Sequence, residues 1–235
     1  MNQLGKAVLA EFVGVFCFVF LGAGSICTLV VDTGGGINIV AVALAHGLAL
    51  AVVIAALGRF SGGYMNPAVT FAMALTGRFG PGRAAACMVA QLLGAAVAGA
   101  ALAEVYPAAV AGAPAWLGLP GIAENLGSGQ ATLLEMIMTF VLVLVVFGTA
   151  VDPAGPRNLA PFAIGLTLTA AIVVGGPLTG AALNPARYFG PAMATGRWAN
   201  WYVYLVGPLL GGAVAGLVYE HFLLGESAPK PRGKR

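Results

Sequence analysis

Two short stretches of the chain share one pattern, SGGYMNPA at residues 61–68 and TGAALNPAR at residues 179–187. Asn is a preferred N-cap, because its side-chain oxygen accepts a hydrogen bond from an unpaired N–H of the first helical turn. Pro directly after it suits the first helical position, where its missing N–H costs nothing. Each stretch therefore predicts the start of a helix. The residues of the two motifs are Asn66, Pro67, Ala68, Asn184, Pro185 and Ala186.

Both predicted helices are short, because each reaches a Thr-Gly pair, Thr76-Gly77 or Thr195-Gly196. Gly is the usual residue just past a helix C-terminus. About 11 residues at a rise of ~1.5 Å span ~16 Å, roughly half of a ~30 Å hydrocarbon core. Two half-helices, near 66–76 and 184–195, can cross a membrane together if their N-termini meet at its centre.

The composition indicates an integral membrane protein surrounded by a lipid bilayer. Hydrophobic residues make up 60% of the chain and charged residues 8%, whereas soluble domains contain about 25% charged residues. The three cysteines, Cys17, Cys27 and Cys87, form neither a disulfide framework nor a metal set. The sequence contains no catalytic triad, phosphate-binding loop or metal-ligand spacing. We therefore expect no enzyme activity, no cofactor and no nucleic-acid partner.

Hydrophobic runs predict six spans, and an even number of spans places both termini on one side of the membrane. If that side is cytoplasmic, only Arg187 and Arg197 of the 11 basic residues lie outside, as the positive-inside rule favours. We therefore expect a multi-pass protein of the cell membrane with both termini in the cytoplasm. The predicted spans lie near 4–30, 37–58, 82–103, 130–150, 159–177 and 200–223.

The two halves of the chain are similar in sequence. LLGAAVAG at 92–99 matches LLGGAVAG at 209–216, and Gly47-Leu48 matches Gly165-Leu166. Because each half contains three spans, an odd number, the second half must be inverted relative to the first. The sequence thus predicts an all-α membrane protein with six transmembrane helices and two half-helices that meet at the midplane. The expected units are one channel domain, 1–226, with repeats near 4–103 and 130–223, and a short basic cytoplasmic tail, 227–235.

Two carboxylates, Glu11 and Glu135, occupy corresponding positions in the first and fourth spans. Carboxylates inside a membrane are costly and are functional candidates by default. They could relay protons in a coupled transporter, or accept hydrogen bonds from backbone N–H groups of the irregular segments before the half-helices. One carboxylate per repeat favours the second role, which supports the loops.

The midplane is expected to repel cations. With Asn66 and Asn184 as caps, their NH2 groups remain as donors, and each half-helix brings about half a positive charge to its N-terminus. A water molecule can present its oxygen to both amides, whereas protons and cations meet a barrier. Arg187 adds a permanent charge with fixed donors in the first turn of the second half-helix.

Together these features resemble the aquaporins, the major intrinsic protein family. The resemblance extends from Ala10-Glu11-Phe12 to Gly207-Pro208 and depends most on the doubled Asn-Pro-Ala, with Arg187 after the second copy. It implies a homotetramer with one pore per protomer. It also implies a narrow selectivity filter, here called the filter set, formed by His46, Ile172, Ala181 and Arg187.

The filter set differs from that of strict water channels, which usually have Phe and His where this chain has His46 and Ile172. It is similar to the set of some plant vacuolar aquaporins, which implies tolerance of ammonia and urea. Tyr188 follows Arg187 where glycerol facilitators usually have Asp. Tyr64 stands where many members have a His that lines the cytoplasmic vestibule. The sequence therefore leaves the width of the inner pore undetermined.

The sequence therefore predicts a passive channel that conducts water and small neutral solutes such as ammonia or urea, and excludes protons and ions. One alternative is a glycerol or urea facilitator. Another, from a different class, is a proton-coupled secondary transporter that uses Glu11, Glu135 and His46.

Overall fold

The computed structural model describes residues 1–224, and the tail predicted at 227–235 lies outside the described residues. Within the described part, the regular structure is helical and no strand occurs. The α-helices are α1 Gln3–Thr33, α2 Ile39–Ser61, α3 Pro67–Leu75, α4 Pro81–Val105, α5 Ser128–Val146, α6 Ala160–Thr179, α7 Pro185–Thr195 and α8 Trp201–Val218. Four short helical turns are η1 Ala108–Ala111, η2 Trp116–Gly118, η3 Phe147–Val151 and η4 Tyr219–Leu223.

Six of the described helices are long and apolar enough to cross a membrane, which confirms the predicted number of spans. α1 continues past the predicted end at residue 30. It ends before Gly34, whose left-handed backbone (φ 69°) is typical of the residue just past a helix C-terminus. The spans of α5 and α8 both finish in π-helical turns, η3 and η4. Neither π turn nor the short 3-10 turns η1 and η2 were predicted from the sequence.

The first and third spans of each half pack on each other, α1 on α4 and α5 on α8. Gly94 of α4 lies against the carbonyl of Phe12, and Gly211 of α8 lies against the carbonyl of Met136. A side chain at either glycine would collide with the backbone of the facing helix, so small residues permit the close approach. The same contact in both halves shows the internal repeat in three dimensions.

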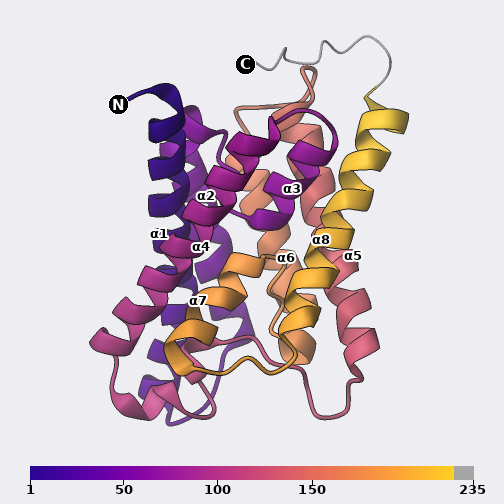
Figure 1. Cartoon of the computed structure of the whole chain (residues 1–235). Helices are drawn as coiled ribbons and strands as arrows, with labels where there is room; N and C mark the ends of the chain where they lie inside the picture. The colour runs from indigo at the N-terminus through magenta and orange to yellow at the C-terminus, as the bar shows by residue number, and fades with distance from the viewer. Residues whose placement is uncertain (225–235) are drawn as a thin grey trace.

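The second half is inverted relative to the first. Figure 1 shows α3 in the half of the bundle nearest the N-terminus and α7 in the opposite half. Each half-helix packs mainly on a span of the other repeat, α3 on α8 and α7 on α4. The half-helices are therefore held by contacts between the repeats, and the predicted fold class is confirmed.

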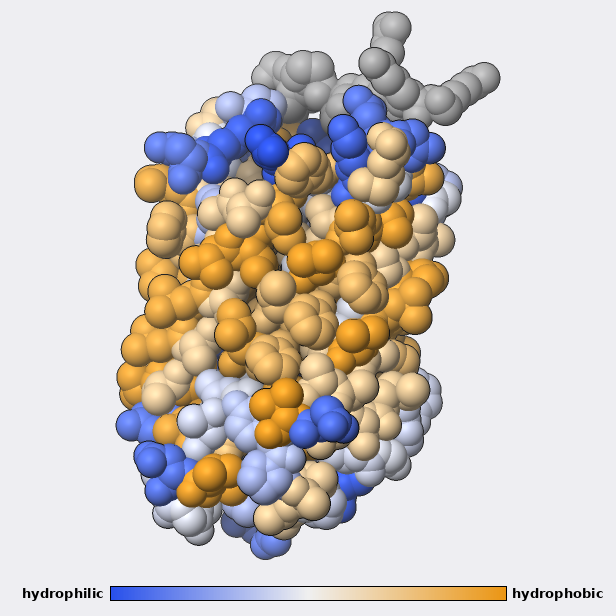
Figure 2. Space-filling model, turned by 90° about the vertical axis from the view of Figure 1, so that its left-hand side faces the viewer, coloured by the Kyte–Doolittle hydropathy of each residue, from blue (hydrophilic) through white to orange (hydrophobic). Residues whose placement is uncertain are grey.

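The outer surface has the polarity of a membrane protein. Figure 2 shows a broad apolar band with hydrophilic residues gathered at both ends of the molecule. At the end where α1 begins, here called the N-terminal face, a buried ion pair joins Arg78 Nε to Glu220 Oε2 at 2.8 Å. This pair connects the segment after α3 to the end of α8, and so links the two repeats.

Candidate functional site

The two asparagine caps connect the half-helices directly. Asn66 Oδ1 accepts from the N–H of Ala68 at 2.8 Å and begins α3, and Asn184 Oδ1 accepts from the N–H of Ala186 at 2.9 Å and begins α7. Pro67 and Pro185 occupy the first helical positions after these caps.

The amide nitrogens of the caps reach across to the opposite loop. Asn66 Nδ2 donates to the carbonyl of Leu183, and Asn184 Nδ2 donates to the carbonyl of Met65, each at 2.9 Å. From the sequence we expected both N–H groups of each amide to remain free for permeating molecules. The structure uses one of them, because the buried carbonyls of the facing loop need donors. One N–H per amide remains.

Glu11 supports the loop before α3. Its Oε1 accepts from the N–H of Tyr64 at 3.1 Å, and its Oε2 accepts from the N–H of Met65 at 2.7 Å. Gln91 of α4 donates to the same Oε2 through Nε2 at 2.6 Å. Met65 has a φ of 49°, a left-handed conformation that costs a non-glycine residue about 1–2 kcal/mol. The carboxylate thus stabilises a loop that is unfavourable on its own.

Glu135 makes the equivalent contacts before α7. It accepts from the N–H groups of Ala182 at 3.0 Å and Leu183 at 2.8 Å, and from the hydroxyl of Thr179 at 2.7 Å. Leu183 is left-handed like Met65, with a φ of 52°. Both carboxylates are fully buried. Since every carboxylate oxygen accepts from at least one donor, the geometry is that of a loop support.

His46 and Arg187 form a buried polar pair. His46 Nδ1 lies 2.9 Å from the carbonyl of Val42, which can only accept, so Nδ1 carries the proton. Its Nε2 is then the acceptor for Arg187 Nε–H at 3.0 Å. Arg187 is 2% exposed, and its Nη1 has no partner among the described residues. That nitrogen is a buried cationic donor still available for a hydrogen bond.

Ile172 lies in the C-terminal half of α6, and Ala181 lies in the loop that follows this helix. Both are 2% exposed, and Ala181 lies beside Gly175, one helical turn from Ile172. Ala181 has a φ of 45° in the loop that Glu135 supports. The structure thus bonds His46 directly to Arg187 and places the other two in α6 and the loop that follows it. Their closure into one ring with the bonded pair stays a prediction.

A narrow cavity of about 10 Å³ runs between the repeats past both asparagines. This volume is about that of a single water-sized probe. Beyond Tyr64, towards the N-terminal face, lies a wider cavity of about 260 Å³ that Arg78 and Arg157 also line. We call the first the central passage and the second the vestibule.

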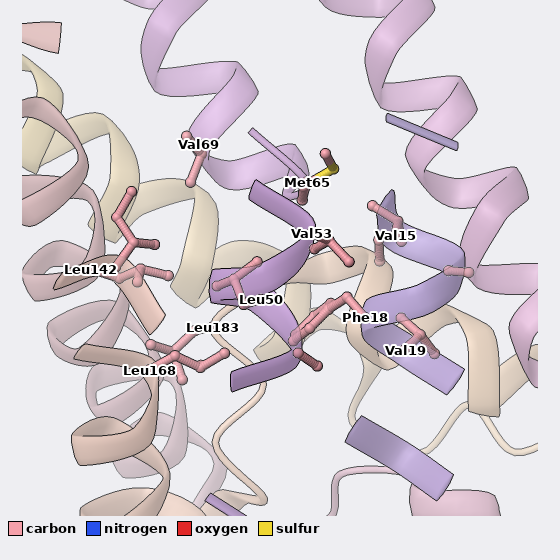
Figure 3. Close-up of a cluster of buried hydrophobic side chains, with 14 of the residues drawn as sticks. Val15, Phe18, Val19, Leu50, Val53, Met65, Val69, Leu142, Leu168 and Leu183 are labelled. Atoms are coloured by element: carbon pink, nitrogen blue, oxygen red, sulfur yellow. The ribbon is translucent and has the colours of Figure 1, made fainter. Parts of the chain in front are cut away.

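The walls of the central passage are mostly aliphatic, and these residues were not predicted from the sequence. Figure 3 shows several of them together with the core residues packed around them. The internal repeat contains a signal that could have found them, because Leu50 and Leu168 lie three residues after Gly47 and Gly165. The aliphatic and aromatic wall residues include Phe18, Leu50, Ile54, Val69, Leu142, Val146, Ile164 and Leu168.

The sequence also matches known proteins along its whole apolar part. A model of the family described as Major intrinsic protein matches residues 1–219. The chain belongs to this family. Aquaporin TIP4-4 of Zea mays is 41% identical to this major intrinsic protein over 231 residues, which cover 96% of this chain and 90% of that protein. Probable aquaporin TIP3-2 of Arabidopsis thaliana is 44% identical, with 93% of this chain and 84% of that protein covered.

The fold of this major intrinsic protein is similar to a solved structure. The X-ray structure of the aquaglyceroporin from Plasmodium falciparum matches with a TM-score of 0.83 over 93% of this chain and 96% of that chain, at 24% identity. Together the family and the aquaporin relatives confirm the predicted family and the predicted class of function. This major intrinsic protein is a passive membrane channel for water and small solutes and not an enzyme.

The positions of the cysteines predict weak inhibition of this major intrinsic protein by mercuric chloride. Cys27 and Cys87 are fully buried and Cys17 lies on the partly exposed side of α1. None of the three lines the central passage or the vestibule. Ala181→Cys is expected to create strong inhibition, because the filter assignment predicts a thiol at this position to lie in the pore. Osmotic shrinkage of proteoliposomes with and without mercury measures both effects.

The matched control is Ala170→Cys, which adds a thiol to the exposed side of α6, the helix before the loop that contains Ala181. It should leave the channel as insensitive as the wild type. An Ala181→Cys channel no more sensitive to mercury than Ala170→Cys, or complete block of the wild type at low micromolar mercury, would refute the placement of Ala181 beside the pore.

Proposed function

We propose that water is the main permeant, that each protomer contains one pore, and that protons and ions are excluded. The observation that carries this proposal is the placement of Asn66 and Asn184 on a passage of about 10 Å³, with the buried Arg187 Nη1 free to donate. A passage of this size has room for about one water molecule at a time. The donors in it then set the orientation of each water molecule.

The barrier to cations comes from permanent positive charge along the pore. The N-termini of α3 and α7 face the same point, and each contributes roughly half a positive charge. The remaining N–H of each Asn amide and the guanidinium of Arg187 add to this positive electrostatic potential. A water molecule adapts by presenting its oxygen, but a proton or metal cation has no equivalent arrangement.

The filter set supports some permeation by small neutral solutes besides water. Ile172 is an apolar wall where strict water channels have a second polar donor, and Ala181 leaves more space than a larger side chain would. An apolar wall lowers the penalty for a solute that forms fewer hydrogen bonds than water. We propose ammonia and urea as secondary permeants.

The contacts of Glu11 and Glu135 argue against a proton-coupled transporter. Each carboxylate accepts two backbone N–H groups and one side-chain donor, so protonation of either would break contacts that hold a pore loop. Stopped-flow shrinkage of proteoliposomes separates the two classes. Rapid shrinkage that has a low activation energy and does not depend on a pH gradient supports the channel. Solute uptake that depends on the pH gradient supports the transporter. Glycerol and urea gradients in the same vesicles identify a facilitator.

We propose that the N-terminal face is cytoplasmic, because Lys6, Arg59, Arg78, Arg83 and Arg157 lie at that end of the spans. We also propose a homotetramer, as the family resemblance implies, in the cell membrane. Accessibility of a tag after residue 1 in intact cells tests the orientation. Light scattering of the detergent-solubilised protein tests the tetramer, and the location of a fluorescent fusion tests the membrane.

The filter assignment predicts the effect of a double substitution. His46→Phe with Ile172→His should restore the usual lining of strict water channels. We expect most of the water permeability to remain and ammonia and urea permeability to fall by a larger factor, on the order of tenfold, because the ring then offers a second polar donor and less apolar wall. The measured quantity is the ratio of solute to water permeability in the same vesicles.

The control is a double substitution of similar chemistry away from the pore, Phe162→His with Val173→Phe, since both side chains are exposed on the outside of α6. An unchanged ratio in the pore variant, or a wild type that conducts neither ammonia nor urea, would show that the ring or the inferred tolerance is wrong.

A further inference from the structure

The central passage and the vestibule share five lining residues, and these define the neck between them. The shared residues are Ile54, Gly63, Tyr64, Val146 and Ile164. On one side of the neck there is about 10 Å³ of space and on the other about 260 Å³. The space available to a solute therefore changes abruptly at this point.

Three of the five neck residues correspond to residues of the filter set through the internal repeat. Gly47 and Gly165 are separated by the same number of residues as Asn66 and Asn184, so positions between them correspond one to one. The counterparts of His46, Ile172, Ala181 and Arg187 are Ile164, Ile54, Gly63 and Val69, and all four counterparts line the central passage. None has a polar side chain. The inverted repeat thus places an apolar equivalent of the filter on the other side of the asparagines.

Tyr64 is the only polar side chain of the neck, and its position is well supported. Its backbone N–H is held by Glu11, and its ring packs edge-on against Phe79 with centroids 4.9 Å apart. On the other side the ring lies over Gly62, where an added side-chain carbon would come within 2.5 Å of the ring and the hydroxyl. The glycine therefore leaves the space that the Tyr64 ring occupies.

The Tyr64 hydroxyl has no hydrogen-bond partner among residues 1–224. Since Tyr64 lines both cavities, this hydroxyl can bond to a molecule that passes the neck. A solute with several polar groups would find one donor or acceptor there and otherwise aliphatic walls. It would lose most of its hydrogen bonds on entry, which is unfavourable for urea and glycerol and least so for water.

We propose that this neck is a second selectivity constriction and that Tyr64 sets its size limit for neutral solutes. The inference rests on the proposed function as a water channel and deepens it. Selection then occurs twice along the route. The first step, at the filter set, is polar and excludes cations, and the second, at the neck, is apolar and slows the passage of solutes wider than water.

The test is the ratio of glycerol and urea permeability to water permeability in proteoliposomes. Tyr64→Ala is expected to raise this ratio on the order of tenfold, because it removes the ring from an otherwise aliphatic neck. Ile164→Val removes one methyl group from another residue of the neck and should give a smaller rise. Because Ile164→Val is conservative, it keeps the proposal testable if Tyr64→Ala fails to fold.

The matched control is Tyr202→Ala, since Tyr202 is 41% exposed on α8 and lines neither cavity. Its ratio should equal that of the wild type. If Tyr64→Ala and Ile164→Val still conduct water and give the same ratio as the control, the second constriction is overturned. The proposed function is left intact by that result. A wild type with no water permeability above empty vesicles overturns both.

Discussion

Glu135→Gln is expected to lower the thermal stability of the protein markedly and to abolish most of its water permeability. Glu135 Oε1 accepts from Ala182 N–H and Oε2 from Leu183 N–H, at 3.0 and 2.8 Å. A Gln amide must turn its NH2 group towards one of them, so two donors face each other in a fully buried site. Leaving a buried donor unsatisfied beside another donor costs about 3 kcal/mol.

For a chain of this length, that free energy corresponds to a fall in the unfolding midpoint of about 6–12 °C. The measurement is the midpoint in detergent, together with water permeability per reconstituted protein. Glu104→Gln is the matched control, because Glu104 is exposed on α4 and the same chemical change there should alter neither quantity. A Glu135→Gln protein as stable as this control would mean that the loop before α7 does not depend on the carboxylate.

Arg187→Val is expected to admit protons or monovalent cations while water permeability survives. The substitution places at this position the residue type that the first repeat has at Val69. It removes the buried charge and leaves His46 Nε2 without its donor. At a separation of about 8 Å and an effective dielectric constant near 20, one charge contributes about 2 kcal/mol to the barrier, or about 30-fold in the rate of cation passage.

Proton leak is measured with a pH-sensitive dye inside the vesicles, and water permeability is measured by shrinkage of the same preparation. Arg197→Val is the control, because Arg197 stacks on Trp116 with its guanidinium 3.7 Å from the ring centre and lines neither cavity. A variant at Arg187 as proton-tight as the Arg197 control would show that the two asparagines and the helix dipoles form the barrier without the arginine.

The features that follow from local chemistry were predictable. Asn66 and Asn184 begin helices because an Asn side chain caps the first turn and Pro tolerates the next position, and this depends on neighbouring residues alone. The number of spans follows from runs of apolar residues long enough to cross a bilayer. The repeat and its inversion follow from matching segments and an odd number of spans per half. Glu11 and Glu135 stood out because carboxylates in an apolar run need donors.

The tertiary structure alone decided how these parts meet, since the contacts join residues far apart in the chain. The Asn66 amide donates to Leu183 and the Asn184 amide to Met65, so an N–H expected to face the pore holds the opposite loop instead. The neck around Tyr64 consists of aliphatic side chains that resemble ordinary core residues in the sequence. Their role depends on which side of each helix faces the passage, and only the packing of the two inverted repeats against each other determines that.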